Sequence, residues 1–353
     1  VRLVGSEMCI RDSVCTVCEE VGMEGATGID VSMLKGKKLL NMDSEEEGVM
    51  LASCAGGCRA DVKLPVERET VSGTKLTVSL SGLTGGHSGS EIDKGRGNAN
   101  TLMSRLLRDA SAPVAIASID GGRKDNAIPR ECTAQIIVAP GEAVAVKASI
   151  EQAAAEIAEE FKTSDPDLKL TVSEETDCSE SAISAKDSAR VIALIEALPN
   201  GIIRMSREID KLVETSLNLG VLKSDDAAVT LRYAVRSSVG VAKKSLKNQL
   251  VCIAGAFAAE VTFEGDYPAW EYKKDSKLRE DMVRIFEEMY GKKPTVEAIH
   301  AGVECGLLSG KIEGLDCISM GPDMYDIHTT EERLSISSAK RSYEYILRVI
   351  ACK

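Results

Sequence analysis

The length, composition and charge of the chain indicate a globular protein and narrow its functions. Its 353 residues are 44% hydrophobic and 28% charged, which is typical of folded domains rather than disordered or fibrous chains. The net charge of −12 argues against a nucleic-acid partner, because phosphate binding requires clustered lysine and arginine. No apolar run reaches the roughly 18 residues of a membrane span, so we expect no membrane contact.

The eleven cysteines are odd in number and scattered, and several lie in apolar runs. A chain of this length does not need disulfides to stabilise its core, so the pattern favours reduced thiols and a cytoplasmic protein. Cys15 and Cys18 form a Cys-x-x-Cys pair, but they lie in a strand-like run rather than at a helix start. A redox or zinc role for this pair is therefore disfavoured.

Residues 1–13 fit no regular element and lack the apolar centre of a signal peptide. They resemble translated adapter sequence. We therefore expect this segment to be non-native and the natural chain to be cut near Val14.

The next part of the sequence predicts two strands joined by a short helix. Strands are expected over 14–18 and 37–42, with a helical crossover over 29–34. Such a βαβ unit makes its two strands parallel. Glu20 and Asp43 then stand at the carboxyl ends of the strands, which is the edge where open α/β sheets bind ligands.

From about residue 62 the hydrophobic pattern changes to strict alternation. Leu76, Val78 and Leu80 share one face of a predicted strand over 75–83, which is typical of a half-exposed antiparallel sheet. Similar strands are expected over 114–119, 132–138, 168–172, 229–235 and 261–263, and helices over 143–161, 189–198 and 242–259. This order predicts an α+β domain with helices on one face of a sheet.

The last part of the chain returns to an α/β pattern. An amphipathic helix is expected over 276–290, with Gly291 as its C-terminal stop. Short apolar strands follow over 296–299 and 317–320, and a helix over 337–350 closes the sequence.

The simplest division of these elements is one domain inserted into another. Residues 14–60 and 268–353 would form a mostly parallel α/β domain, and residues 61–267 an inserted α+β domain.

Acidic residues near the strand ends are candidates for a hydrolytic metal site. Such a site needs hard oxygen or imidazole ligands, and a further carboxylate that takes a proton from bound water. Glu19 would be the base and Glu20 a ligand, and Asp43, directly after its strand, a second ligand. The alternative is a solvated acidic turn for the glutamates and an exposed charge run for Asp43.

Histidine supplies the third kind of ligand. The chain has only His87, His300 and His328, and a lone histidine is more often structural than a ligand. His328 differs because its loop follows the last predicted strand and so leaves the same sheet edge as Glu20 and Asp43. Three ligand types from three strand ends indicate a metal site more strongly than any one of them.

Six short motifs carry a family resemblance, in the order in which the family has them. Residues 17–25 resemble the segment that holds the catalytic and ligand glutamates of co-catalytic zinc peptidases of the carboxypeptidase G2 and aminoacylase superfamily. The other motifs lie at residues 41–48, 85–89, 126–131, 300–306 and 327–332. Together they resemble the aminoacyl-histidine dipeptidases, also called cytosol non-specific dipeptidases, of the M20 metallopeptidase family.

This resemblance implies an α/β catalytic domain of the zinc-peptidase type with an inserted lid. It implies hydrolysis of dipeptides, either Xaa-His or of broad specificity, at a site of two zinc ions, with manganese or cobalt as alternatives. Glu19 matches the general base, and Glu20, Asp43 and His328 match metal ligands.

The resemblance also implies substrate-binding residues. His87, in the lid, would polarise the scissile carbonyl, and Asn126 and Arg236 would contact the substrate. Arg236 is the candidate for the terminal carboxylate of the dipeptide, which a guanidinium fork fits well. His300 and Glu304 would line the pocket.

The sequence departs from the family at two metal ligands. The family supplies a histidine and a metal-bridging aspartate ahead of the paired glutamates, and residues 1–13 contain no histidine. Two cations without a bridging carboxylate repel each other strongly, so we expect this fragment to be inactive. The alternatives are an N-acyl amino acid amidohydrolase of the same superfamily and a non-catalytic fragment. The oligomeric state stays open.

Overall fold

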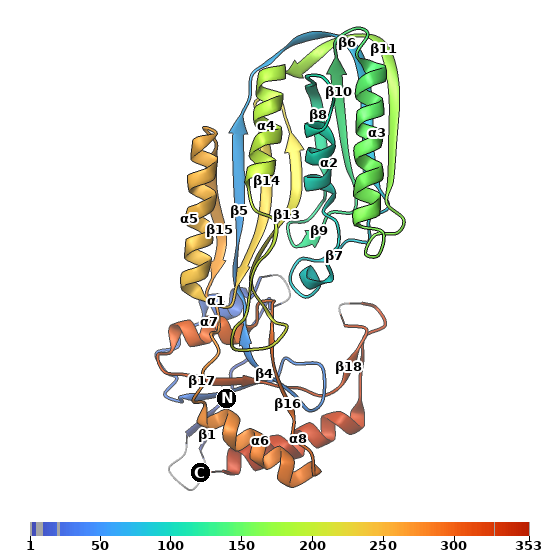
Figure 1. Cartoon of the computed structure of the whole chain (residues 1–353). Coiled ribbons are helices and arrows are strands. Elements are labelled where there is room, and N and C mark those ends of the chain that lie inside the picture. Colours follow the sequence, from blue (N-terminus) through green and yellow to red (C-terminus); the bar gives the residue numbers. More distant parts are fainter. Residues whose placement is uncertain (1, 5–9, 20–21, 328, 353) are drawn as a thin grey trace.

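The computed structural model describes residues 2–4, 10–19, 22–327 and 329–352. Two sheets organise most of it, one above the other in Figure 1. The small-sheet domain contains four strands and the helices α1, α6, α7 and α8, and the large-sheet domain contains nine strands and the helices α2 to α5. Of the predicted site residues, Glu20 and His328 lie outside the described residues.

The small sheet has the order β16-β4-β17-β3. Its strands are β16 (Thr295–Ile299), β4 (Val49–Cys54), β17 (Asp316–Ser319) and β3 (Lys38–Asn41). β16 is parallel to β4 and β17 is parallel to β3, whereas β17 meets β4 in antiparallel fashion. Successive residues of a strand point to opposite faces, so this sheet has two cores.

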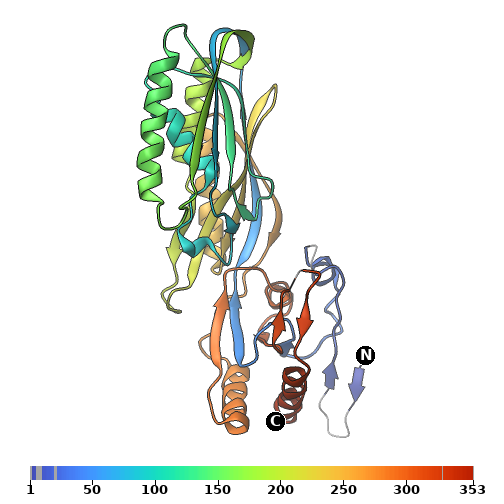
Figure 2. The ribbon, with the colours of Figure 1, turned by 90° about the vertical axis from the view of Figure 1, so that its right-hand side faces the viewer.

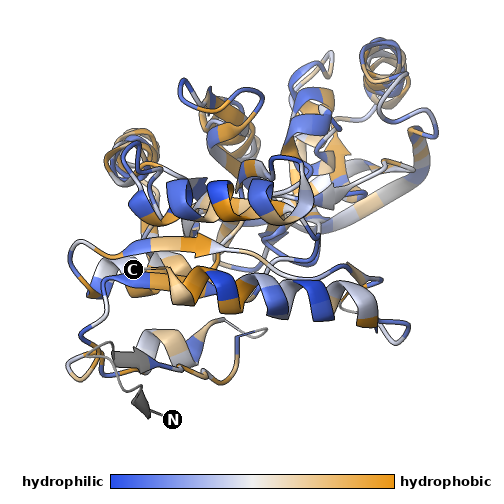
Figure 3. Ribbon diagram, turned by 90° about the horizontal axis from the view of Figure 1, so that it is seen from below, coloured by the Kyte–Doolittle hydropathy of each residue, from blue (hydrophilic) through white to orange (hydrophobic). Residues whose placement is uncertain are grey.

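Helices α6 (Lys277–Tyr290) and α8 (Ile336–Ala351) cover one face, over Met50 and Ile318. Helix α7 (Glu304–Lys311) contributes to the other core, with Cys54 and Cys317. The short α1 (Glu24–Gly28) lies beside α7. The view from below in Figure 3 shows hydrophilic and hydrophobic residues mixed along α6 and α8, as expected of helices that cover a sheet on one side.

Local signals fix the ends of these helices. Ser276 caps α6 by accepting from the Arg279 amide at 3.0 Å, and Gly291 ends it with φ of 67°, which glycine adopts without steric cost. The buried carboxylate of Asp316 accepts from the Ser276 hydroxyl at 2.6 Å and from the Leu278 amide at 3.0 Å. The predicted helix and its stop are confirmed.

The large sheet has the order β11-β6-β10-β8-β13-β14-β5-β15, with β12 paired to β13, and its neighbouring strands are antiparallel. Its strands are β5 (Gly56–Pro65), β6 (Arg68–Ser81), β8 (Ala115–Gly121), β10 (Cys132–Val138), β11 (Lys169–Ile183), β12 (Gly201–Met205), β13 (Val213–Ser224), β14 (Ala228–Ser237) and β15 (Glu260–Tyr267). Leu76, Val78 and Leu80 are buried on one face of β6, as predicted. The expected first domain boundary, at residue 60, falls inside β5.

Four helices lie against this sheet: α2 (Ala99–Arg108), α3 (Ala143–Glu160), α4 (Ala185–Ala197) and α5 (Gly240–Ala256). Their buried residues share one hydrophobic core with the sheet, and Figure 2 shows α2, α3 and α4 on one side of it. The expected α+β domain, with helices on one face, is confirmed.

The large sheet is built from two halves of equal topology. β6, α2, β8, β10, α3 and β11 form the first half, and β5, α4, β13, β14, α5 and β15 form the second. The two strand orders run in opposite directions from the centre, where β8 and β13 pair antiparallel. We call this mirrored strand order palindromic. It was not visible in the sequence, because the first half is inserted after β5, the first strand of the second half.

The predicted strand over 14–18 and the predicted crossover helix over 29–34 are wrong. The parallel neighbour of β3 is β17. A strand needs a partner for its backbone groups, and here the carbonyl of Val17 instead accepts from the Gly25 amide at 2.9 Å. The segment is therefore held by α1 rather than by a sheet. Three two-stranded sheets complete the described fold: β1 (Arg2–Val4) with β2 (Ile10–Asp12), β7 (Gly86–His87) with β9 (Ala127–Ile128), and β18 (Met324–Tyr325) with β19 (Arg333–Leu334).

The Asp316 carboxylate gives a first testable prediction. Asp316→Ala should lower the free energy of unfolding by about 1–3 kcal/mol, because it leaves the Ser276 hydroxyl and the Leu278 amide buried without an acceptor. Asp275→Ala, at an exposed neighbouring position, is the control and should stay within about 0.5 kcal/mol. Urea unfolding followed by the fluorescence of Trp270, the single tryptophan, measures both. Equal losses in the two variants would contradict the assignment.

Candidate active site

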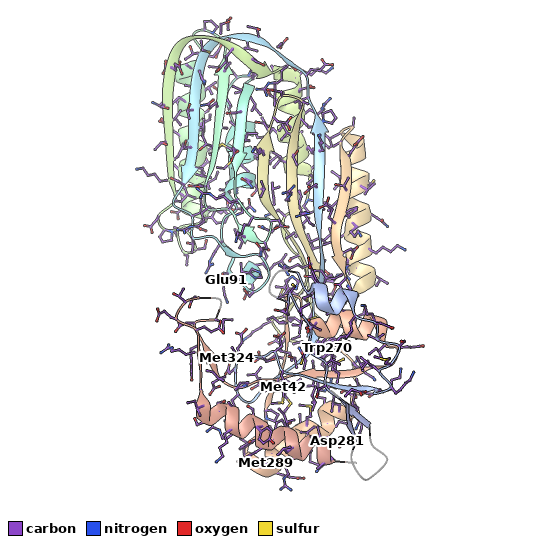
Figure 4. The ribbon with its side chains drawn as sticks, turned by 180° about the vertical axis from the view of Figure 1, so that it is seen from behind. Met42, Glu91, Trp270, Asp281, Met289 and Met324 are labelled. Atoms are coloured by element: carbon purple, nitrogen blue, oxygen red, sulfur yellow. The ribbon has the colours of Figure 1, made fainter. Side chains whose placement is uncertain are left out.

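Three charged or titratable side chains meet where the large-sheet domain faces the small-sheet domain. Arg236 lies near the end of β14, His87 in β7 (Gly86–His87), and His300 directly after β16. A Cβ atom at Gly89 would lie 2.5 Å from the His300 carbonyl oxygen, so the His87 loop touches the small-sheet domain directly. Figure 4 shows Glu91, of the same loop, at the end of the large-sheet domain that faces the other domain.

The His87 loop is held by backbone pairing and by an ion pair. β7 pairs with β9 (Ala127–Ile128), and the Ser88 amide donates to the Asn126 carbonyl at 2.9 Å. Glu91 accepts from the His87 amide at 2.8 Å and pairs with Arg96 at 2.8 Å. The loop therefore brings His87 and Asn126, two of the predicted substrate-binding residues, side by side.

The proton position on His87 follows from its hydrogen bonds. Its Nδ1 atom lies 3.1 Å from the Ser90 amide, which can only donate. Nδ1 is therefore an acceptor, and the neutral ring carries its proton on Nε2. Burial first, and the positive charge of Arg236 second, lower the pKa of His87, while Glu91 opposes them. His87 is thus a neutral ring whose Nε2–H can donate.

His300 is a buried, neutral imidazole. It is 5% exposed, and its Nε2 atom lies 2.7 Å from the hydroxyl oxygen of Ser216 on β13. Burial and then the charge of Arg236 lower its pKa to about 3. His300 therefore joins the two domains without carrying charge at neutral pH.

Arg236 is a buried cation without a carboxylate partner among the residues that the structure describes. Its side chain is 9% exposed, and its Nη1 atom donates to the Tyr267 hydroxyl at 3.4 Å. Its buried Nε–H has no hydrogen-bond partner among those residues. An unpaired buried charge is costly, so such a guanidinium is suited to an anionic ligand.

A second group of residues gathers at the start of α7. Glu304 accepts from the Thr16 hydroxyl at 2.6 Å and so fixes the segment that leads to Glu19. A hydrogen bond with Cys317 and burial raise the pKa of Cys305, and neighbouring charges, including that of Asp43, raise it further. Asp43 therefore lies near α7, and Ser44, the next residue, donates its amide to the Met320 carbonyl at 3.4 Å.

The described residues do not by themselves complete a metal centre. Among them, no three histidine, cysteine, aspartate or glutamate side chains are placed to hold one metal ion. Asp43 follows the carboxyl end of β3, as predicted, and the loop toward residue 328 leaves the parallel neighbour β17. The donor chemistry of the predicted set, carboxylate and imidazole, suits zinc.

Sequence reasoning did not identify two residues of this junction. Ser216 forms a hydrogen bond with His300, and Tyr267 forms one with Arg236. The sequence marked Tyr267 only as the end of a domain, and nothing in the sequence around Ser216 distinguishes it from other strand serines.

Comparison with known proteins decides the family. A family model described as the peptidase dimerisation domain of M20 peptidases matches residues 78–165. The chain is 34% identical over 327 residues to the cytosol non-specific dipeptidase of Escherichia coli strain K12, covering 92% of this chain and 67% of that protein. The chain belongs to the M20 peptidase family.

A solved structure supports the same assignment for this M20 peptidase. The aminoacylhistidine dipeptidase of Vibrio alginolyticus superposes with a TM-score of 0.87 at 33% identity, covering 95% of this chain and 69% of that one. The expected resemblance and fold class are confirmed, as is assignment to an enzyme family of dipeptidases. The small-sheet domain corresponds to the catalytic domain, and the large-sheet domain to the lid.

The comparisons imply metal dependence for this M20 peptidase, without identifying the metal. The residues 78–165, which match the family's dimerisation domain, lie within the first half of the large sheet. In the described part of the chain, no helix is long and apolar enough to cross a membrane.

The pKa of His300 predicts a dependence of stability on pH. The ordinary pKa is 6.5 and the folded value about 3, so between these values the unfolded chain binds a proton that the folded chain does not. Stability should therefore fall as the pH is lowered from 7 to 5, approaching about 1.4 kcal/mol per pH unit at the acid end from this group.

Urea unfolding at pH 5, 6 and 7 tests this pH dependence. The slope should be smaller in His300→Gln, which keeps a polar side chain but cannot titrate. The same slope in both proteins would show that His300 does not resist protonation.

Proposed function

We propose that this M20 peptidase hydrolyses dipeptides, of the Xaa-His type or of broad specificity, in a metal-dependent reaction in the cytoplasm. The observation that carries the proposal is Arg236, a buried guanidinium with no described carboxylate partner, between two neutral histidines. A dipeptide is the smallest peptide that offers both a terminal carboxylate and an amide bond close to it.

Arg236 would bind the terminal carboxylate. A guanidinium matches a carboxylate with parallel hydrogen bonds, and its Nε–H is one donor that is available for this purpose. His87 and His300 stay neutral beside it, so neither adds a positive charge that would favour larger anions. The ion pair between Arg236 and the terminal carboxylate would fix the substrate by its C-terminal end.

His87 would act on the scissile carbonyl. Its Nε2–H, fixed by the bond to Nδ1, would donate to the carbonyl oxygen, where negative charge develops during attack. Asn126, held beside it by β7 and β9, would orient the peptide. Glu304 would position the Glu19 segment through Thr16 and form a wall of the pocket with His300.

Glu19 would be the general base. It would take a proton from the attacking water and pass it to the leaving amine, so the amide is cleaved with no net change in protons. Glu20, Asp43 and His328 would hold metal, zinc in our proposal, with manganese or cobalt as alternatives. A bound divalent ion supplies Lewis-acid polarisation and a more acidic water.

We also propose that the 353 residues alone hydrolyse dipeptides slowly or not at all. Residues 1–18 contain no histidine that could match the further metal ligand of the family. Binding of the substrate through Arg236 does not depend on that ligand and can therefore be tested on the chain itself.

The carboxylate assignment is tested by binding. Arg236→Gln should weaken the binding of alanyl-histidine by about 10–100-fold, because hydrogen bonds to charged groups contribute about 1.5–3 kcal/mol. Binding of the C-terminal amide of the same dipeptide should hardly change. Titration calorimetry measures both.

Arg232→Gln is the matched control. Arg232 lies on the same strand but is paired with Asp61 at 2.8 Å, and its loss should leave both affinities unchanged. N-acetylalanine in the same titrations tests the alternative substrate class. Equal binding of dipeptide and amide to the unaltered chain would refute carboxylate recognition.

The base assignment is tested in a hybrid that joins residues 14–353 to the preceding segment of the Escherichia coli relative. The hybrid should hydrolyse alanyl-histidine with added zinc. Glu19→Gln should lower its kcat by about 10²–10⁴-fold at unchanged metal content. Glu24→Gln, at an exposed position of α1, should have little effect. Full turnover of Glu19→Gln with bound metal would rule out Glu19 as the base.

A further inference from the structure

Arg236, Gly57 and Tyr267 lie in one row across three neighbouring strands. Arg236 of β14 is paired with Gly57 of β5, and Gly57 is paired with Tyr267 of β15. Paired residues of adjacent strands point to the same face of a sheet. The middle position of the row has no side chain, so nothing separates the outer two.

The missing side chain at Gly57 is what allows Tyr267 to reach Arg236. A Cβ atom at Gly57 would lie 2.6 Å from the Tyr267 hydroxyl oxygen and 2.8 Å from the ring carbon that bears it. The phenol therefore lies across the α-carbon of Gly57. Its hydroxyl then accepts from Arg236 Nη1 at 3.4 Å.

The same ring also touches the small-sheet domain. A Cβ atom at Gly302, two residues after His300, would lie 2.9 Å from the ring and 3.0 Å from its hydroxyl oxygen. Tyr267 is thus placed between one glycine of each domain. Figure 4 shows Trp270, three residues further on, at the top of the small-sheet domain.

The backbone of Tyr267 is anchored as well. The buried Lys243 of α5 donates to the Tyr267 carbonyl and pairs with Asp266 at 2.7 Å. The ring cannot easily turn away, because its main chain is tied to a helix and its faces are enclosed by two glycines.

We propose that Tyr267 is the positioning residue of the carboxylate-binding arginine. Its hydroxyl holds one arm of the Arg236 guanidinium, which leaves the Nε–H for the substrate, and its ring fixes this arrangement against the catalytic domain. The proposal rests on the proposed function, because it assigns Arg236 to the terminal carboxylate of a dipeptide.

Binding to the 353-residue chain tests the proposal. Tyr267→Phe keeps the ring and removes the hydroxyl, and it should weaken the binding of alanyl-histidine about 3- to 10-fold. Binding of the C-terminal amide should not change. Gly57→Ala should reproduce the loss, because its methyl group displaces the phenol. Tyr272→Phe is the matched control, since the Tyr272 ring stacks on Arg279 at 4.7 Å, away from this row.

A double variant separates positioning from general stability. With Arg236→Gln already present, Tyr267→Phe should cause no further loss, because the two residues act as one unit. Equal weakening of the dipeptide and the amide by Tyr267→Phe would show a merely structural role. A loss with Arg236→Gln but none with Tyr267→Phe would overturn this proposal and leave the proposed function intact. No effect of Arg236→Gln would refute the proposed function.

A second measurement needs no ligand. In protein labelled with ¹⁵N-arginine, the Nε–H resonance of Arg236 is assigned by its loss in Arg236→Gln. Tyr267→Phe should shift this resonance and Tyr272→Phe should not. An unchanged resonance in Tyr267→Phe would overturn the proposal, whatever the binding data show.

Discussion

A buried positive charge with no carboxylate partner among the described residues governs the chemistry of the junction between the two domains. Arg236 is 9% exposed and its Nε–H has no hydrogen-bond partner in the part of the chain that the structure describes, a state that costs free energy until an anion binds. The nearby His87 and His300 do not relieve that cost, because both have lowered pKa values and neither carries a negative charge. In the proposed function, the substrate supplies this anion.

The large sheet supplies this arrangement through strand order more than through loops. Arg236 stands beside Gly57 and Tyr267 only because β14, β5 and β15 are neighbours. The His87 loop is instead fixed by a side chain. The buried carboxylate of Asp165 holds both ends of this loop, because it accepts from the amides of Thr84 and Gly97 at 2.8 Å each. A loop fixed at both ends can place a neutral imidazole without losing much entropy when a substrate binds.

The sequence predicted where the strands and helices lie better than it predicted which strands pair with one another. Alternation located β10 (Cys132–Val138) to the residue, because one buried face imposes a period of two. The strand expected over 14–18 failed, since pattern alone does not tell whether a partner strand is present. The roles of Ser216 and Tyr267 were not predicted for the same reason. Each role arises from a contact with a residue far away in the sequence, at a separation of 84 positions for Ser216 and 31 positions for Tyr267. The family resemblance named His87, Arg236 and His300 as candidates, because resemblance carries three-dimensional information that periodicity lacks.

The palindromic sheet has two halves of the same topology, but the candidate site lies at only one of its ends. Its two halves share one topology, so the sheet has two equivalent ends as far as the backbone is concerned. The end of β6, which leads to His87, and the end of β14, which carries Arg236, both face the small-sheet domain, although they belong to different halves. The equivalent strand ends, Pro65 of β5 and Val138 of β10, carry neither an imidazole nor a guanidinium. The repeated topology therefore gives the large sheet two equivalent ends, and the position of the small-sheet domain determines at which of these ends the site forms.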